Sequence, residues 1–146
     1  MRILALDPGA KRVGIAISDE LKLIAQPLEF VPAKPFADFL ARLKQLVEQK
    51  EVELILVGMP RNMDGTYGPA ASRVQEFVSD LEKAIPLRIR KWDERLTTVQ
   101  ANRILTEANV RRDKRKQKVD KMAAAILLQS YLDSLHEPDS TTDEHR

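Results

Sequence analysis

The sequence predicts an α/β fold in which a five-stranded mixed sheet is flanked by helices. Two observations lead to this prediction. The first 31 residues contain short, β-branched apolar segments joined by a turn signal, which is typical of antiparallel strands. From residue 36 onward, apolar residues at helical spacing alternate with short apolar runs, as in units where a helix joins two parallel strands. An antiparallel hairpin followed by such units predicts a sheet of mixed strand direction.

Three strands are expected at the start of the chain. Residues 2–7 are apolar and end at a turn signal, Asp7-Pro8-Gly9, and residues 12–18 resume a β-branched segment, so the two form a hairpin. Residues 23–31 form the third strand. Pro27 lacks the backbone N–H that a central strand needs, and it therefore favours an edge or irregular position for this strand.

Helices and strands alternate in the rest of the chain. The predicted order is a helix over 36–47, a strand over 53–57, a helix over 74–81, a strand over 87–92, and helices over 97–108 and 119–131. The run at 53–57 is short and wholly apolar, as in a parallel sheet that is covered on both faces. Pro86 ends the second helix. Thr97 and Gln100 have the spacing of a capping box that opens the third.

The composition is that of one soluble domain. The chain has 146 residues, of which 43% are hydrophobic and 32% charged, and this balance is typical of a globular protein. We expect one domain over residues 1–135 and a disordered polar tail over 136–146, because the tail lacks apolar anchors. No apolar run approaches the roughly 20 residues that span a bilayer, and the N-terminus has no signal-peptide core. We therefore expect a cytoplasmic location and no membrane partner.

Residue usage also argues against several kinds of chemistry. The chain has no cysteine, which excludes disulfides, thiolate zinc sites and cysteine nucleophiles. Its two histidines, His136 and His145, lie in the tail, and this weighs against histidine acid–base catalysis. Carboxylates remain as the groups that could carry chemistry.

Basic residues crowd one short segment, although the net charge of the chain is only +2. Its cations are Arg111, Arg112, Lys114, Arg115, Lys116, Lys118 and Lys121. A charge run taken alone is more often a solvated loop than a nucleic-acid patch. The candidate substrate-binding residues are Lys114, Arg115 and Lys116 in this run, Lys11 and Arg12 in the first hairpin, and Arg95.

Four acids lie where predicted elements begin or end. Asp7 ends the first strand, Asp93 and Glu94 end the fifth, and Asp120 opens the last helix. Were the first and fifth strands neighbours, their ends would meet at one edge of the sheet. Each acid also has a structural explanation. Asp7 can start a turn, Asp93 or Glu94 can pair with Arg95, and Asp120 can cap its helix for about 1 kcal/mol.

Taken together, the acids indicate a site for divalent metal ions. Mg²⁺ and Mn²⁺ prefer oxygen ligands, and two such ions about 3.5–4 Å apart can activate a water and stabilise the leaving oxygen of a phosphodiester. The candidate ligands are Asp7, Asp93, Glu94 and Asp120. Alternation along a strand puts Asp93 and Glu94 on opposite faces, so only one of them is expected to point at the metals. The basic segment runs into Asp120 and would draw a polyanion there, with salt-dependent affinity.

Four segments, taken in order, resemble one known family. They are LALDPGAKRVGIAISD, VGMPRNMDGTYGPAASRVQEF, DERLTT and KRKQKVDKMAAAILLQSYLD. Together they are similar to the YqgF family, whose members are also described as RuvX-like, as Holliday junction resolvases or as pre-16S rRNA nucleases. The resemblance covers residues 1–135. Any one of the motifs is weak, since Asp-x-Gly hairpins are widespread, but the four together are specific.

The resemblance implies an RNase H-like fold and a nuclease that depends on divalent metal ions. Carried over by motif, the catalytic acids are Asp7, Glu94 and Asp120, with Asp93 as a close rival of Glu94. The implied activity is endonucleolytic processing of the 5′ end of pre-16S rRNA during ribosome biogenesis. The implied partners are therefore pre-rRNA and, by fold, branched DNA.

Other functions stay open on the sequence. The alternative within the class is a Holliday junction resolvase, which acts as a symmetric dimer; the sequence fits a monomer or a homodimer. A non-catalytic RNA-binding regulator would keep the basic segment and not need the acids. A phosphotransferase of the actin-like type would need two such domains, and this chain has length for one. A platform for stacked bases would need exposed aromatic residues, and the candidates are Tyr67 and Trp92, with Trp92 expected to be buried.

Overall fold

The computed structural model of the chain describes residues 1–60, 68–93 and 112–136, and for residues 112–121 it describes the backbone alone. Within this part of the chain, five strands form one sheet in the order β3-β2-β1-β4-β5. Their bounds are Arg2–Pro8 for β1, Arg12–Ser18 for β2, Ala25–Pro32 for β3, Val52–Met59 for β4 and Arg88–Asp93 for β5. The predicted mixed five-stranded sheet is therefore confirmed.

The first three strands form an antiparallel meander, and the last two run parallel to β1. The prediction for Pro27 is confirmed, because β3 is an edge strand whose register shifts beside this residue. The strand begins at Ala25 rather than at residue 23. The reason is that the Asp19 carboxylate accepts the backbone N–H groups of Leu23 and Ile24, at 2.8 and 3.0 Å. These two hydrogen bonds lower the pKa of the Asp19 carboxyl, and the bond from Ile24 has the larger effect.

The structure settles the strand order, which the sequence left open. β1 and β5 are not neighbours, because β4 pairs with β1 on one side and with β5 on the other. The helix that follows the meander returns the chain to the free edge of β1, and the next crossover adds β5 outside β4. The carboxyl ends of β1, β4 and β5 still lie at the same edge, since the three strands are parallel.

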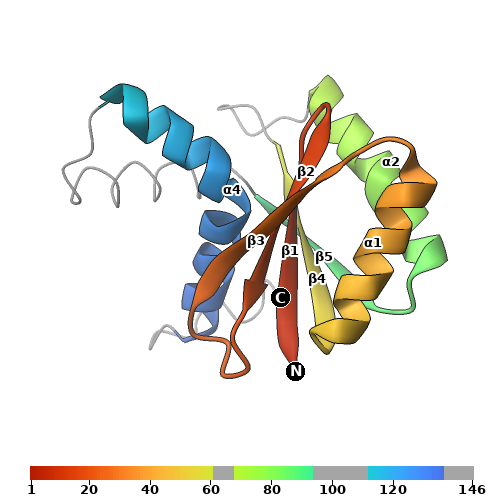
Figure 1. The fold of residues 1–146 in the computed structure, drawn as a ribbon, viewed down its shortest axis with the longest axis horizontal. Coiled ribbons are helices and arrows are strands. Elements are labelled where there is room, and N and C mark those ends of the chain that lie inside the picture. Colours follow the sequence, from red (N-terminus) through yellow and green to blue (C-terminus); the bar gives the residue numbers. More distant parts are fainter. Residues whose placement is uncertain (61–67, 94–111, 137–146) are drawn as a thin grey trace.

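Helices cover both faces of the sheet (Figure 1). Helices α1 (Phe36–Gln49) and α2 (Pro69–Ala84) pack on one face, and α4 (Arg112–Leu135) packs on the other. Helix α2 begins five residues earlier than predicted, because Pro69 occupies its first turn, where a missing N–H costs nothing. The predicted helix over 97–108 lies outside the described residues, and so does the predicted tail from residue 137.

Side-chain alternation along the strands divides the core into two clusters. On β1, Leu4 and Leu6 face α1 and α2, while Ile3 and Ala5 face α4. Phe39 of α1 is fully buried in the first cluster, with its ring centroid 5.4 Å from that of Phe77 in α2. The side chains of each strand therefore lie alternately on the side of α1 and α2 and on the side of α4, and this decides on which side Asp7 and Asp93 lie.

Helix α4 differs from the prediction at its start. It begins at Arg112 rather than near residue 119, so most of the basic segment is helical and is not a loop. Its residues from 112 to 121 are mainly Arg, Lys and Gln, which are good helix formers, with no Gly or Pro among them. Asp120 is consequently the ninth residue of α4 and does not open it. A capping role for Asp120 is excluded.

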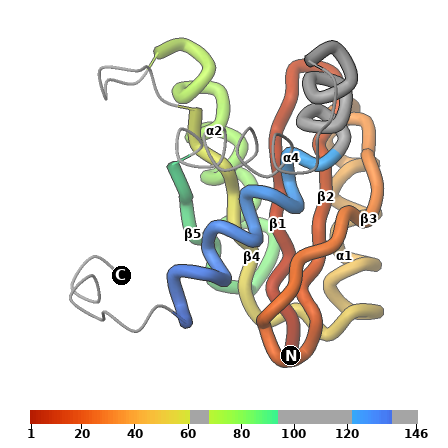
Figure 2. The backbone as a smooth tube through the Cα atoms, turned by 90° about the vertical axis from the view of Figure 1, so that its left-hand side faces the viewer, coloured from red at the N-terminus to blue at the C-terminus, as the bar shows by residue number. Residues whose placement is uncertain are grey.

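Hydrogen bonds hold the second half of α4 on the sheet. In Figure 2 the helix crosses the strands on one side of the sheet. The Gln129 side chain accepts the N–H of Ala25 and donates to the carbonyl of Leu23, both at 2.9 Å. The Trp92 indole N–H donates to Ser130 Oγ at 3.3 Å. Packing and hydrogen bonds thus fix α4 against both edges of the sheet.

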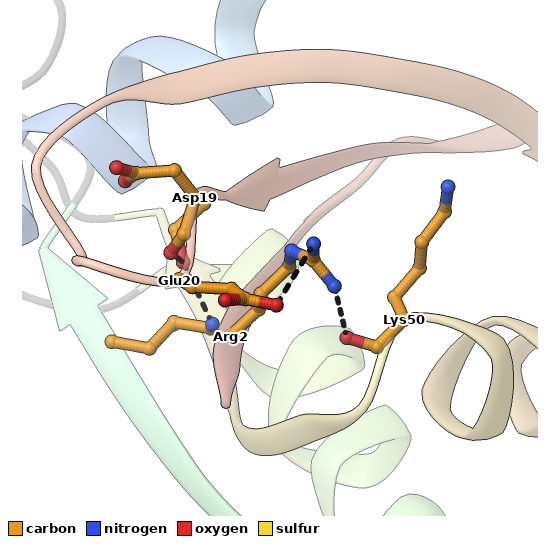
Figure 3. A network of polar contacts seen from close by, with 6 residues as sticks. Arg2, Asp19, Glu20 and Lys50 are labelled. Atoms are coloured by element: carbon orange, nitrogen blue, oxygen red, sulfur yellow. Dashed lines mark hydrogen bonds and ion pairs between the residues drawn. The ribbon is translucent and has the colours of Figure 1, made fainter.

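Polar contacts also close the end of the sheet away from the carboxyl ends of the parallel strands. The Arg2 guanidinium donates to the carbonyl of Lys50 at 2.9 Å and pairs with Glu20 at 3.5 Å (Figure 3). Ser18 is fully buried, and its hydroxyl accepts the N–H of Ile3 and donates to the carbonyl of Asp19, both at 2.9 Å. These bonds tie the strand ends together far from the candidate acids.

A pH-dependent contribution to stability is expected from Glu29 of β3. Two hydrogen bonds from Arg42 of α1, at 2.9 and 2.6 Å, lower the pKa of Glu29. A lowered pKa means that the pair stabilises the fold above the unfolded pKa of about 4.3 and that this contribution is lost as the pH falls through the folded value. We expect Glu29→Gln to be slightly less stable than the wild type in urea at about pH 7, and equally stable near pH 3.

The control for this prediction is Glu48→Gln, which changes an exposed acid of the same helix layer. It should match the wild type at both pH values. A Glu29→Gln deficit that persists unchanged at low pH would show that packing, and not the ion pair, is responsible.

Candidate active site

Asp7 stands at the carboxyl end of β1, where a tight turn follows it. It pairs with Gly14 across the hairpin. The N–H of Gly9 donates to the carbonyl of Arg12 at 2.9 Å, and a Cβ on Gly9 would lie 2.7 Å from that oxygen. Only glycine fits such an approach of two backbones. The turn therefore holds Asp7 at the strand end.

The Asp7 carboxylate faces the side of the sheet that α4 covers. It shares the alternation of Ile3 and Ala5, which pack against α4. It is half-buried, and within the described part of the chain no hydrogen bond or ion pair occupies it. A half-buried carboxylate without a protein partner is suited to binding a cation.

A groove of about 540 Å³ opens beside Asp7. Its lining includes Asp7 with Arg12, Gly14, Phe30, Met122 and Ala124. Gly14 forms its floor, where a Cβ would lie 3.3 Å from Cε1 of Phe30 and 3.8 Å from Cβ of Ala124. The distance to Ala124 is an ordinary van der Waals contact, whereas that to Phe30 is tight, so the absence of a side chain at Gly14 lets the Phe30 ring lie close to the sheet next to the acid.

Two basic residues proposed from the sequence lie at this end of the hairpin. Lys11 is exposed in the turn, and its carbonyl accepts the N–H of Ala33 at 2.9 Å. Arg12 is exposed at the start of β2, with its guanidinium carbon 4.2 Å from the centroid of the Phe30 ring. Arg12 thus lies in the groove wall, and Lys11 stands beyond it.

The structure separates Asp93 from Asp7. On β5, the Trp92 ring packs edge-on against Tyr131 of α4, with centroids 5.1 Å apart. Trp92 therefore occupies the face of Asp7, and Asp93, the next residue, lies on the face of α1 and α2. Glu94 and Arg95 fall outside the described residues.

Asp120 lies on α4, four residues before Ala124. Residues four apart on a helix stand on the same face, and Ala124 is the residue that lines the groove beside Gly14. Lys114, Arg115 and Lys116 belong to the first turns of the same helix, and their side chains are not described. Among the described residues, no three His, Cys, Asp or Glu side chains gather as a metal site. The structure thus brings Asp7 and Arg12 together and gives only the backbone position of Asp120.

The sequence analysis did not single out Phe30, the aromatic residue that the structure exposes beside Asp7. Phe30 is 39% exposed, whereas Trp92 is half-buried against α4, and Tyr67 lies outside the described residues. The signal that could have found Phe30 is its register. An aromatic residue often covers a glycine across a strand pair, and Phe30 stands opposite Gly14.

No helix in the described part of the chain is long and apolar enough to cross a membrane.

Comparisons with known proteins identify the family. The family model described as RuvX, Holliday junction resolvase, matches residues 1–134. A Halothermothrix orenii protein named "Putative pre-16S rRNA nuclease" is 48% identical over 132 residues, which cover 90% of this chain and 94% of the relative. A Bacillus cytotoxicus protein of the same name is 48% identical over 136 residues, covering 92% of this chain and 99% of the relative.

Solved structures share the fold. The fowlpox virus Holliday junction resolvase superposes with a TM-score of 0.53 at 15% identity, covering 92% of this chain and 99% of that chain. RuvC of T. thermophilus, in complex with Holliday junction substrate, gives a TM-score of 0.51 at 15% identity, covering 93% and 96%. Such distant likeness concerns the fold alone, which is RNase H-like as the sequence predicted. With a family model matched over residues 1–134, this chain belongs to the RuvX family of Holliday junction resolvases.

Proposed function

We propose that this chain is a metal-dependent endonuclease that hydrolyses phosphodiester bonds of pre-16S rRNA in the cytoplasm. The observation that carries the proposal is the Asp7 carboxylate, half-buried and without a protein partner among the described residues, beside a groove that Arg12 also lines. An acid for a cation and an arginine for a phosphate lie together there. The names of the relatives supply the substrate, pre-16S rRNA.

The proposed catalytic acids are Asp7, Glu94 and Asp120. Two observations support this set. Asp93 lies on the opposite face from Asp7, because Trp92 packs against Tyr131 on the face of Asp7, and this weighs against Asp93 as the second acid. Asp120 stands one helical turn before Ala124, which lines the groove together with Met122 of the same helix. Because Asp120 lies inside α4, capping the helix does not explain the presence of this acid.

The donor set fits Mg²⁺ or Mn²⁺, because it offers carboxylate oxygens and neither thiolate nor imidazole. Two such ions, when bound, supply an activated water and neutralise charge on the leaving oxygen. The chain itself orients this chemistry. The Gly9–Arg12 turn fixes Asp7, apolar packing and the Gln129 hydrogen bond fix α4 on the sheet, and the Arg12 guanidinium would bind a phosphate next to the one that is cut.

We expect the basic start of α4 to contribute most of the salt dependence of binding. Replacing Lys114, Arg115 and Lys116 together by Gln should weaken RNA binding and flatten the slope of log K against log salt by about 2, since each phosphate contact on a single strand contributes about 0.7. Fluorescence anisotropy over a series of salt concentrations measures the slope. The control is Lys83→Gln on α2, which lies on the other face of the sheet. An unchanged slope in the triple variant would mean that the segment is only solvated.

The test of the function is a cleavage assay that offers a 16S rRNA precursor and a four-way DNA junction side by side, with and without Mg²⁺. Cleavage of the precursor alone supports the proposal. Cleavage of the junction alone would replace it by the second candidate, a junction resolvase, which the description of the family favours. A resolvase needs a symmetric dimer to cut two equivalent strands, so the mass of the protein in solution gives an independent check. Binding of the substrates without cleavage of either one would indicate a non-catalytic RNA-binding regulator.

A further inference from the structure

We propose that the groove between Asp7 and Phe30 binds one unpaired nucleobase of the substrate strand, stacked against the Phe30 ring, with Arg12 paired to the phosphate beside it. The inference rests on the proposed nuclease function and names the form of nucleic acid that its site takes. The substrate would be single-stranded, or splayed open, at the position next to the cut.

The first support is the alignment of the three residues across the sheet. Asp7 pairs with Gly14, and Gly14 pairs with Phe30, so the two side chains stand in one row on the same face. Neighbouring strands lie about 4.8 Å apart, which places the backbones of Asp7 and Phe30 roughly 10 Å apart. A strand whose phosphate pairs with Arg12 next to Asp7 therefore brings an adjacent base within reach of the ring.

The second support is the chemistry of the groove wall. Phe30 is 39% exposed, and Pro27, Met122 and Ala124 continue an apolar surface around it. A nucleobase presents a flat face that stacks on aromatic rings whatever its sequence. The volume of about 540 Å³ leaves room for one base and part of its sugar.

The third support is the distribution of charge. The Arg12 guanidinium lies over the Phe30 ring, 4.2 Å from its centroid, so a cation covers one face of the ring and stands ready for the phosphate of a base stacked on the other face. Glu29 also lines the groove, but Arg42 holds its carboxylate in an ion pair on the side of α1. Among the described residues that line the groove, Glu29 is the acid besides Asp7, and its pairing with Arg42 weakens its repulsion of a phosphate.

An unpaired base is required because a paired one is already stacked on both sides and hydrogen-bonded within a helix. Proteins that read RNA through aromatic rings accordingly take bases from loops, bulges and ends. Phe30 lies on the edge strand of the sheet, where a base can approach from solvent.

The experiment measures stacking directly, in the absence of metal ions so that nothing is cleaved. The probe is a set of short single-stranded RNAs, each with 2-aminopurine at one position, whose fluorescence falls when the base stacks. Wild-type protein should quench the probe and bind it. Phe30→Ala and Phe30→Leu should lose the quenching and bind about tenfold more weakly, whereas Phe30→Tyr, which keeps a ring, should behave as wild type. A fully paired duplex should be bound equally by all four proteins.

Two controls separate this effect from damage to the fold. Leu21→Ala removes an exposed apolar side chain at the other end of the meander, 73% exposed, and should bind as wild type. Phe30→Leu keeps an apolar side chain, and circular dichroism checks that it folds. Equal quenching by Phe30→Ala and wild type would overturn the inference. It would also be overturned if Phe30→Ala weakened the binding of the paired duplex as much as the binding of the single strand.

The outcomes also separate this inference from the nuclease function. Wild-type protein that cleaves precursor while Phe30→Ala matches it in quenching, affinity and KM overturns the base site and leaves the nuclease intact. Wild-type protein that quenches the probe through Phe30 but cleaves neither RNA nor junction supports the base site and overturns the nuclease.

Discussion

Replacing Asp7 by asparagine is expected to lower the rate of cleavage by roughly a thousandfold, since the change removes a charged oxygen ligand from the centre that positions the metal ions. Affinity for RNA should survive, because Arg12 and the basic start of α4 remain. Titration calorimetry with Mn²⁺ should show weakened metal binding in the same variant, and more so when Asp120→Asn is added.

Stability should not account for this loss. Asp7 is half-buried and has no hydrogen bond or ion pair within the described residues, so Asp7→Asn should change the free energy of unfolding by less than about 1 kcal/mol. Asp80→Asn is the matched control, since it makes the same change at an exposed position of α2. Undiminished cleavage by Asp7→Asn would remove Asp7 from the metal site.

The largest effect on stability is expected from Phe39→Ala. Phe39 is fully buried between α1, α2 and the sheet, with ring centroids 6.2 Å from Phe36 and 5.4 Å from Phe77. Truncation leaves a cavity among rings that cannot collapse into it, and such changes cost about 3–5 kcal/mol. Urea denaturation should show this loss, and the melting temperature should fall by roughly 10 °C.

The matched variant is Phe39→Leu, which keeps most of the side-chain volume and should cost less than about 1.5 kcal/mol. Phe39 lies on the opposite face of the sheet from Asp7. Where the Ala variant is still folded, its cleavage rate should therefore match that of the wild type. A loss of activity without a loss of stability would mean that the two faces of the sheet are coupled.

Local pattern predicted most of the fold. The predicted second strand, 12–18, has the bounds of β2, and the edge position of β3 followed from Pro27. The sequence pattern was less informative about strand order, since the insertion of β4 between β1 and β5 depends on crossovers between residues far apart. The early start of α4 was missed because a run of charges has no apolar period, although its residues favour helix.

The candidate site was predicted in part, for a similar reason. Asp7 could be found from the turn that follows it, and alternation along β5 puts Trp92 and Asp93 on opposite faces. Which face is occupied by α4 could not be found in that way, because it depends on the contact of Trp92 with Tyr131. Phe30 was missed because its place beside Asp7 depends on the register across three strands and on the absence of a side chain at Gly14.

The continuity of α4 has a geometric consequence. One uninterrupted helix joins the basic residues at 114–116 to Asp120 and to the half of the helix that Gln129 and Tyr131 anchor on the sheet. With a rise of about 1.5 Å per residue, the backbone of Lys114 stands roughly 9 Å along the axis from that of Asp120. The helix therefore keeps this distance fixed. Under the proposed function, it would hold a constant distance between the basic residues proposed to bind a strand and Asp120, the acid proposed to take part in cutting it, so the position of the cut would be set along the nucleic-acid backbone.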